Sequence, residues 1–594
     1  MFTGLIEAFP KRLTQFGGDI DARRLRELAS AETRSEIIRA ADEAAAKPWP
    51  LLLASHYRDY TLTGNRTRFE DLYFSRRLQL NALVLGECLE GAGRYLDAIV
   101  DGLWLICEES GWQLPAHNAQ IRGGARAPLP GTDHPVIDLF AAETGANLAL
   151  CLHLLSGQIE GVAPVVTERV RHEIDRRITR PYLTQHFWWM GNGDERMNNW
   201  TAWITQNVLL STFLLPQDET TKYEVACKAL KSLDAFQKDY GEDGACEEGV
   251  LYYGHASLCL FGAMTILDRV SGGALTPLFS TPKLRNMAEF IVHMHVSGSR
   301  YFNFADAPAT YETTGIREYL FGAAVGSKEL QAFAVERWKA SADRLMTSEW
   351  NLWYRILAIL TATTMMEGEA ARDKTDALYP SIGLFIARDA IFDLAVKAGT
   401  NGESHNHNDV GSFIIYKNGK PLFIDVGVGS YTAKTFSPSR YEIWTMQSGY
   451  HNLPVIGGAM QGAGTDYGAQ DFSADFQDAG ARVSFDMSGA YPAPVSSHRY
   501  RRTVELFRNS HIEIRDSYDG DDDIQLVLMS VEVPVFEAGI LRLADLAEIG
   551  LEGIGAPSIE AIPIDDARLR QSWPEKIYRI VLKAHERRFC LTIR

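Results

Sequence analysis

The spacing of apolar residues changes near residue 370, and this change constrains the fold more than any other feature of the chain. Before it, segments such as Val136–Leu155 and Trp200–Leu215 carry apolar residues every three or four positions, which predicts helices with a buried face. After it, short alternating runs such as Thr503–Phe507 predict β-strands. The charged, apolar-poor stretch at 367–374 separates the two patterns and predicts a domain boundary.

Each half of the chain predicts its own architecture. Consecutive helical hairpins with few strands favour a helical toroid or solenoid over a bundle. Short strands separated by turn signals favour an antiparallel β-sandwich. We therefore expect an α+β multidomain protein, with a helical domain over residues 1–370 and a β-sandwich over residues 380–594. A chain of 594 residues is also too long for a single hydrophobic core.

The composition excludes several classes of partner. A formal net charge of −17 argues against nucleic acid or an anionic membrane as a partner. No run approaches the roughly 18 apolar residues of a membrane span. The seven cysteines are scattered without a CxxC pair, which predicts reduced thiols. The segment Met1–Leu5 lacks a basic region followed by an apolar one, so we expect a cytoplasmic location, or a periplasmic one if a leader has been removed. The sequence leaves a homo-oligomer open.

One stretch of the second half combines a hairpin signal with metal-binding side chains. Asn418-Gly419 separates two short apolar runs, which predicts a tight β-hairpin. His405 and His407 would lie at the entry of the first strand, on one face because side chains alternate. Asp425 would lie at the exit of the second strand, and antiparallel pairing brings entry and exit together. His451 can join them from the following loop.

These four side chains suggest a metal site with a neighbouring acid–base group. Imidazole nitrogens and carboxylate oxygens are ordinary Zn²⁺ ligands, and three protein ligands leave a fourth position open. We predict His407, Asp425 and His451 as the metal ligands, with Zn²⁺ favoured, Mn²⁺ the alternative and Ca²⁺ disfavoured by two nitrogen ligands. His405 then remains for chemistry. The simpler interpretation is a set of polar residues bonded to backbone at a strand end.

Three polar stretches of the first half also suit a sugar ligand. Asn198-Asn199-Trp200, followed by Trp203, offers amide donors and stacking faces, although an asparagine cap and core indoles are the alternative. A loop with two tyrosines, Tyr252 and Tyr253, enters the next helix, where tyrosine is more often a packing residue than a catalyst. His117 lies in a third polar loop.

Together these residues resemble the heparinase II/III family of polysaccharide lyases. The resemblance implies an (α/α) toroid followed by an antiparallel β-sandwich. The family includes heparin and heparan sulfate lyases and alginate and oligoalginate lyases, so it implies β-elimination at a uronic acid without choosing the uronic acid. The matching pieces lie in the family's order between about residues 188 and 458: Asn198-Asn199-Trp200, Glu248-Gly249-x-x-Tyr252-Tyr253, His405-Asn406-His407-Asn408-Asp409, Asp425-Val426-Gly427 and His451-Asn452.

The resemblance also implies roles for individual residues. Asn199, with Asn198 beside it, resembles the asparagine that neutralises the substrate carboxylate. Tyr252 or Tyr253 resembles the general acid, and it is a suitable donor only if neighbouring donors or cations lower its pKa. His405 would be the second acid–base group. Zn²⁺ would organise the sandwich rather than carry out the chemistry.

The expected substrate is an anionic, uronate-containing oligo- or polysaccharide. Some family members follow the asparagine with a histidine base, whereas this chain has Trp200 at that position. Tyrosine and His405 are therefore the remaining candidates for the acid–base groups. Tyr441 lies on the loop between the last two metal ligands and is expected to line the cleft. The side chains expected to bind substrate are Asn198, Trp200, His117, Glu248 and Tyr441.

Two other classes of function remain as alternatives. A glycoside hydrolase or epimerase on a helical toroid needs two carboxylates at hydrolytic spacing. Glu247 or Glu248 with Asp194 or Asp306 would supply them. A non-catalytic sugar-binding protein would keep the aromatic residues but would need neither the tyrosine pair nor the His-X-His sequence.

Overall fold

The structure is a computed structural model that describes residues 1–594, except for the side chains of Ala433 and Phe436. The chain divides into two compact units. The stretches 240–254 and 286–312, which the sequence places in the helical half, belong to the second unit. The division at 370–380 stays a prediction about separately folding domains. The first unit comprises Met1–Asp239, His255–Arg285 and Thr313–Ala371, and the second comprises Tyr240–Gly254, Asn286–Glu312 and Arg372–Arg594.

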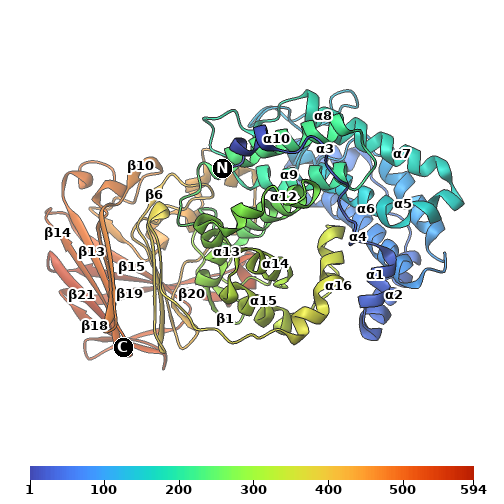
Figure 1. Cartoon of the computed structure of the whole chain (residues 1–594). Coiled ribbons are helices and arrows are strands. Elements are labelled where there is room, and N and C mark those ends of the chain that lie inside the picture. Colours follow the sequence, from blue (N-terminus) through green and yellow to red (C-terminus); the bar gives the residue numbers. More distant parts are fainter. The chain divides into compact units, whose positions relative to one another are not determined.

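The first unit is a closed ring of paired helices (Figure 1). Each inner helix contacts the next around the ring, and the last one contacts α1 (Ala22–Leu28), which returns to the first. The inner helices are, in order, α4 (Thr67–Glu90), α6 (Leu139–Val162), α9 (Asn199–Phe213), α12 (Ser257–Val270), α14 (Ile316–Val325) and α16 (Leu352–Glu367). The outer helices that pack on them include α2 (Ala31–Ala45), α5 (Leu96–Glu108), α7 (Pro164–Ile174), α10 (Glu219–Gln237) and α15 (Lys328–Ala340). This arrangement confirms the predicted (α/α) toroid.

Several inner helices are buried on nearly every side because they are surrounded by other helices. From Thr201 to Phe213, every residue of α9 is buried. Asp138 caps α6, accepting the Ala141 amide at 2.7 Å. Two stretches, Leu139–Val162 and Val250–Val270, are long and apolar enough to cross a membrane, but 83% and 78% of their apolar windows are buried inside the protein.

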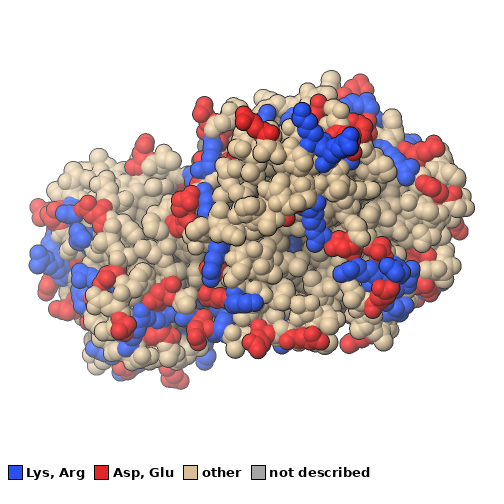
Figure 2. All heavy atoms as spheres, viewed as in Figure 1, with Lys and Arg blue, Asp and Glu red and all other residues tan. Residues whose placement is uncertain are grey.

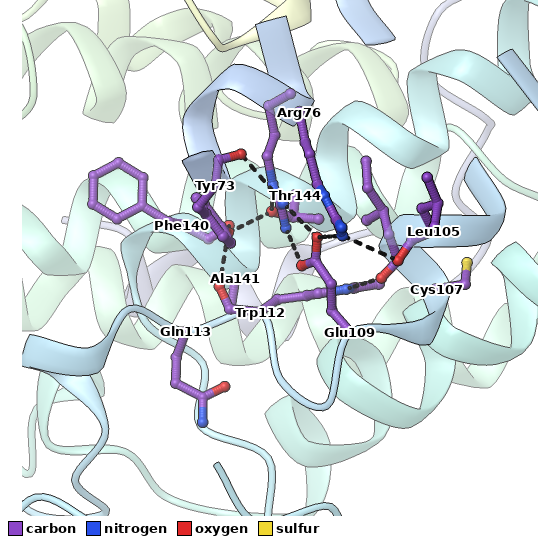
Figure 3. Close-up of polar contacts among 12 residues, drawn as sticks. Tyr73, Arg76, Leu105, Cys107, Glu109, Trp112, Gln113, Phe140, Ala141 and Thr144 are labelled. Carbon is purple, nitrogen blue, oxygen red and sulfur yellow. Dashed lines mark hydrogen bonds and ion pairs between the residues drawn. The ribbon is translucent and has the colours of Figure 1, made fainter. Parts of the chain in front are cut away.

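A buried ion-pair network anchors the loop that follows α5 (Figure 3). Glu109 accepts from Arg76 Nη1 at 3.0 Å and from Arg77 Nη2 at 2.7 Å, and both arginines lie on α4. The Tyr73 hydroxyl, also on α4, donates to the Trp112 carbonyl at 2.7 Å. Removing the carboxylate would leave two buried cations, which is costly. The network therefore fixes the chain that leads into the polar segment η2 (Pro115–His117).

The second unit is an antiparallel β-sandwich, as predicted. Its largest sheet has the strand order β11-β12-β13-β14-β21-β18-β17-β16, and two further sheets have the orders β19-β20-β15-β9 and β3-β4-β5-β7-β8. Val504 of the largest sheet, Leu526 and Phe413 belong to a core cluster that all three sheets share. The strands of these sheets are β3 (Ala377–Tyr379), β4 (Leu384–Arg388), β5 (Phe392–Lys397), β7 (Phe413–Lys417), β8 (Lys420–Phe423), β9 (Pro454–Ile456), β11 (Gln470–Gln477), β12 (Gly480–Asp486), β13 (Tyr500–Phe507), β14 (His511–Tyr518), β15 (Ile524–Ser530), β16 (Pro534–Glu537), β17 (Ile540–Leu543), β18 (Ala547–Glu552), β19 (Ile554–Pro563), β20 (Lys576–Ala584) and β21 (Arg588–Ile593).

The predicted hairpin is present, but the two histidines do not lie on it. Asn418 and Gly419 have φ values of 51° and 73°, the left-handed geometry of a tight turn between β7 and β8. The first strand begins only at Phe413, so His405 and His407 lie in the preceding loop, and the prediction that they share a strand face is wrong. In this loop, side chains rather than a neighbouring strand accept hydrogen bonds from backbone amides. The Val410 amide donates to Gln461 Oε1, and the Asp409 amide donates to Asn401 Oδ1.

Candidate functional site

Three fully buried side chains of the second unit form a potential metal centre. Ligand atoms of His407, Asp425 and His451 all lie within 4.8 Å of one another. His451 Nδ1 is 3.0 Å from Asp425 Oδ2, and His407 Nδ1 is 3.9 Å from Asp425 Oδ1. The cluster that the sequence predicts is therefore present, although loops on both sides of the hairpin assemble it rather than one strand face.

Several atoms of this cluster lack hydrogen-bond partners among the described residues. They are His407 Nδ1, Asp425 Oδ2 and both ring nitrogens of His451, whose contact with Asp425 is short but not in hydrogen-bond geometry. Each buried polar atom left unpaired costs about 1–3 kcal/mol. Burial raises the pKa of Asp425, but His451 and His407 outweigh that effect and lower it overall. An ionised carboxylate beside two imidazoles is a donor set that fits a metal cation.

Tyr252 and His405 form a stacked pair beside the metal centre. Their ring centroids are 4.2 Å apart with an interplanar angle of 30°. Tyr252 lies on the short helix α11 (Val250–Tyr253), whose cap Gly249 has φ 85° and lies so close to the Phe304 carbonyl that a Cβ would meet it at 2.7 Å. The glycine thus allows the close approach that places the tyrosine.

The neighbouring tyrosine has a different environment. Tyr253 is fully buried, and its hydroxyl donates to the Ala288 carbonyl at 2.8 Å. The hydroxyl is therefore engaged with backbone inside the second unit. Of the two tyrosines that the resemblance leaves open, the geometry favours Tyr252 as the acid.

Asp306 is the centre of the polar network around this pair. Its Oδ2 lies 2.8 Å from His405 Nδ1 and 3.2 Å from the Tyr431 hydroxyl. Its Oδ1 lies 3.2 Å from His407 Nε2 and 2.6 Å from Arg440 Nη2. Burial raises the pKa of Asp306, but the hydrogen bonds from both histidines and the charge of Arg440 hold it well below its usual range. The carboxylate is therefore ionised and accepts from four donors.

The pKa of Tyr252 is raised, whereas a lowered pKa was the condition set for a tyrosine acid. Burial raises the pKa of this hydroxyl well above its ordinary value, and Tyr431, Asp306 and Glu248 raise it further. The condition of a lowered pKa is not met, first because the hydroxyl is buried and then because the charged groups close to it are carboxylates rather than cations. Tyr252 is therefore protonated at neutral pH and can donate its proton.

The loop residue that contacts this pair is Tyr431 rather than Tyr441. The Tyr431 hydroxyl lies 2.9 Å from the Tyr252 hydroxyl, and burial together with Asp306 raises the pKa of Tyr431 to about 12. The Tyr441 hydroxyl instead accepts from Asn406 Nδ2 at 3.5 Å. Sequence reasoning missed Tyr431 because the loop after β8 has no periodicity from which to choose a tyrosine.

The structure places Glu248 beside His405, and Asp306 between the two histidines of the loop. Glu248 is 4% exposed, and its Oε2 lies 3.6 Å from His405 Nε2, so it contacts the histidine. The sequence offered Asp306 only as a hydrolase carboxylate, since its neighbours Phe304, Ala305 and Ala307 carry no recognisable motif.

A second group of candidate residues lies within the first unit, at the start of α9. Asn198 Oδ1 accepts the Trp200 amide at 3.2 Å, so Asn198 caps the helix, as the alternative interpretation proposed. Asn199 is the first helical residue and is 4% exposed. The Trp200 ring lies edge-on to His117 at 4.7 Å, and His117 Nδ1 is 2.7 Å from Asp138 Oδ2. The structure therefore brings Trp200 and His117 together.

The other indole of this segment is part of the core. Trp203 is 8% exposed, donates to Glu143 Oε2 at 3.0 Å, and stacks on His255 with ring centroids 4.0 Å apart. Burial, with a smaller contribution from Arg317, lowers the pKa of His255 to about 3. A neutral, half-buried imidazole thus packs inside the toroid.

We expect this histidine to make the stability of the protein depend on pH. The unfolded imidazole has a pKa of about 6.5, so unfolding takes up a proton below that value. The contribution of the neutral ring is complete above about pH 6.5 and is lost as the pH falls toward the folded pKa; about 2 kcal/mol disappears between about pH 7.5 and 5. Urea unfolding across this range should show a shallower dependence in His255→Gln than in the wild type. Parallel curves would contradict the prediction.

Comparisons with known proteins agree with this architecture. Residues 371–541 match the family model described as "Heparinase II/III-like, C-terminal". A heparinase III gene product with methylated lysines aligns with 100% of this chain and 87% of its own, with a TM-score of 0.59 and 14% identity. Another structure of heparinase III aligns with 99% of this chain and 93% of its own, with a TM-score of 0.58 and 13% identity. Heparan sulfate lyase HepC from Pedobacter heparinus aligns with 95% of this chain and 88% of its own, with a TM-score of 0.57 and 12% identity. No curated protein matches the sequence.

Proposed function

We propose that this chain, whose residues 371–541 match the heparinase II/III-like C-terminal family model, is a polysaccharide lyase that cleaves a uronate-containing glycan by β-elimination. The observation that carries the proposal is the stacked pair of Tyr252 and His405, 4.2 Å apart and joined through Asp306 to a potential metal centre. β-Elimination needs one group that removes the proton at C5 and one that protonates O4. A protonated phenol beside an imidazole provides both.

The two side chains have complementary tasks in this reaction. Asp306 accepts from Nδ1–H of His405, so Nε2, which lies 3.6 Å from Glu248 Oε2, is the ring nitrogen that would take the C5 proton. The C5–H electrons then form the C4–C5 double bond as the C4–O4 bond breaks. Tyr252 transfers its hydroxyl proton to O4, and His405 then carries the proton taken from C5. Both groups return to their starting state when the histidine proton reaches the phenolate.

The environments of the carboxylates favour a lyase over a hydrolase. A glycoside hydrolase needs one protonated and one ionised carboxyl group. Asp306 is held ionised by four donors, and Glu248 contacts His405. Asp306 is therefore not suited to protonate a glycosidic oxygen. Asp194, the other aspartate considered, is exposed in the first unit.

We infer that the metal ion is Zn²⁺, held by His407 Nδ1, Asp425 and His451. Tetrahedral zinc places its nitrogen and oxygen ligands roughly 3.3 Å apart, so the cluster needs only small adjustments. The second ring nitrogen of His407 faces Asp306, which is the arrangement that fixes a metal-binding histidine. When bound, the ion supplies a crosslink between the loop before β7 and the loop after β8.

The substrate is expected to be an anionic glycan recognised by local contacts. Figure 2 shows Lys and Arg interspersed with Asp and Glu on the face drawn, and the whole chain carries a formal charge of −17. A uniformly basic surface would have indicated steering by long-range charge. The identity of the uronic acid and the cytoplasmic location stay predictions.

An absorbance screen tests the function directly. The protein would be incubated with oligomers of alginate, heparan sulfate, hyaluronan and glucuronan. A lyase generates a C4–C5 double bond whose ultraviolet absorbance rises with each cleavage. New reducing ends without that absorbance would identify a hydrolase instead. Binding without cleavage of any polymer would indicate a sugar-binding protein.

Asn199 provides a separate test of the reaction chemistry. If its amide neutralises the substrate carboxylate, Asn199→Ala should lower kcat about a hundredfold or more, the scale of losing one preorganised donor. Substrate affinity should fall much less. Steady-state rates on the best polymer from the screen provide both constants. A change confined to KM would mean that the amide binds substrate and transition state equally, which contradicts the assigned role.

A further inference from the structure

We propose that Asp306 is a positioning residue that sets the tautomer of His405 and joins this histidine to the metal-binding His407. Its carboxylate is fully buried. Oδ2 lies 2.8 Å from His405 Nδ1, and Oδ1 lies 3.2 Å from His407 Nε2. The expected effect on turnover rests on the proposed function. The expected tautomer rests on the geometry alone.

All four partners of this carboxylate act as donors. Arg440 has only N–H groups, so it donates to Oδ1 at 2.6 Å under all conditions. The His405 nitrogen 2.8 Å from Oδ2 must carry a proton to be bonded to an ionised carboxylate. The other ring nitrogen, Nε2, lies 3.6 Å from Glu248 Oε2, which is too far for a hydrogen bond between them, so the proton of a neutral His405 ring is on Nδ1. For the same reason the proton of His407 is on Nε2, which leaves its Nδ1 for the metal.

The variant Asp306→Asn has a defined outcome because only one orientation of its side-chain amide is compatible with the neighbouring groups. The amide oxygen must face Arg440, since a guanidinium cannot accept a hydrogen bond. That orientation keeps an acceptor for His407 on the same side. The amide NH₂ then faces His405, which can remain bonded only if its Nδ1 becomes the acceptor. We expect the proton of His405 to move from Nδ1 to Nε2 while His407 and the metal site are retained.

The experiment combines nitrogen-15 NMR of the histidine rings with metal analysis and kinetics. The His405 signals are assigned by their loss in His405→Gln. In the wild type the neutral ring should show its proton on Nδ1, and in Asp306→Asn on Nε2. The variant should retain about one metal per chain. Its kcat should fall by about a thousandfold or more, as when an aspartate that orients a histidine base is replaced by asparagine, with a small change in KM.

A matched variant separates this effect from the loss of a buried charge. Asp393 is also a buried aspartate of the second unit, paired with Arg388 at 3.0 Å and Lys374 at 2.9 Å. Asp393→Asn should lower stability but leave both the tautomer of His405 and kcat unchanged. If it alters them as strongly as Asp306→Asn does, the proposal is wrong.

Further results would contradict either the proposed role of Asp306 or the lyase proposal. A wild-type His405 that carries its proton on Nε2 would overturn the proposal even if Asp306→Asn failed to fold. Loss of the metal in Asp306→Asn with an unchanged His405 tautomer would assign the carboxylate to the metal site instead. If every polymer in the absorbance screen remained intact, the lyase proposal would fail, whereas the NMR result would still test Asp306.

Discussion

The variant Tyr252→Phe should lose turnover by roughly a hundred- to ten-thousandfold while its fold persists. The substitution removes the hydroxyl that is expected to protonate the leaving oxygen, and general acid catalysis contributes on that scale. The phenyl ring can still stack on His405, and Tyr431 keeps its bond to Asp306. Initial rates of ultraviolet absorbance measure the loss, and circular dichroism checks the fold.

The adjacent tyrosine gives a matched control for this result. Tyr253→Phe removes the same atom, but there the hydroxyl donates to the Ala288 carbonyl inside the second unit. We expect a loss of about 1 kcal/mol in the free energy of unfolding and a nearly normal kcat. If Tyr253→Phe abolished turnover and Tyr252→Phe did not, the acid would have been assigned to the wrong tyrosine.

Removal of the metal should produce the largest change in stability. We expect about one tightly held transition metal per chain, and His407→Ala should lose it. A ligand present at a thousandfold excess over its Kd stabilises the folded state by about 4 kcal/mol, so both His407→Ala and chelator-treated wild type should melt at lower temperature. Elemental analysis and calorimetry measure the two quantities. Metal-free protein with full activity and unchanged melting would show that the centre holds no functional metal.

Replacing the other histidine of this loop, His405, separates the loss of the metal from the loss of the acid–base group. His405→Ala should retain the metal and lose turnover, because this ring stacks on Tyr252 and lies outside the ligand cluster. Loss of the metal in this variant would mean that the roles of the two histidines have been exchanged.

Local signals predicted the fold and part of the site. The turn at Asn418-Gly419 specifies its own left-handed geometry, so the hairpin followed from two residues. The alternation of apolar residues similarly identified the sandwich. The metal cluster was predicted with His407 on the first strand, which is wrong, but the hairpin does form and brings together the loops that carry His407 and Asp425.

The remainder of the site depends on contacts that no local pattern records. Asp306 and Tyr431 are separated by 125 positions, and Asp306 and His405 by 99. No periodicity or spacing connects residues at such distances. The direction of the pKa shift of Tyr252 was also inaccessible, because it depends on burial and on which charges surround the hydroxyl.

The interleaving of the two units along the chain has a consequence for the order in which the protein matures. The segments that carry Tyr252 and Asp306 leave the ribosome before the strands of their own unit. At about 5–20 residues per second, they wait on the order of tens of seconds for the last strand, β21. Tyr252 meets Tyr431 across 179 positions, so a nascent chain that ends after the toroid contains the acid without its partners. Activity should therefore appear only after the later segments of the second unit have been synthesised and have folded around Tyr252 and Asp306.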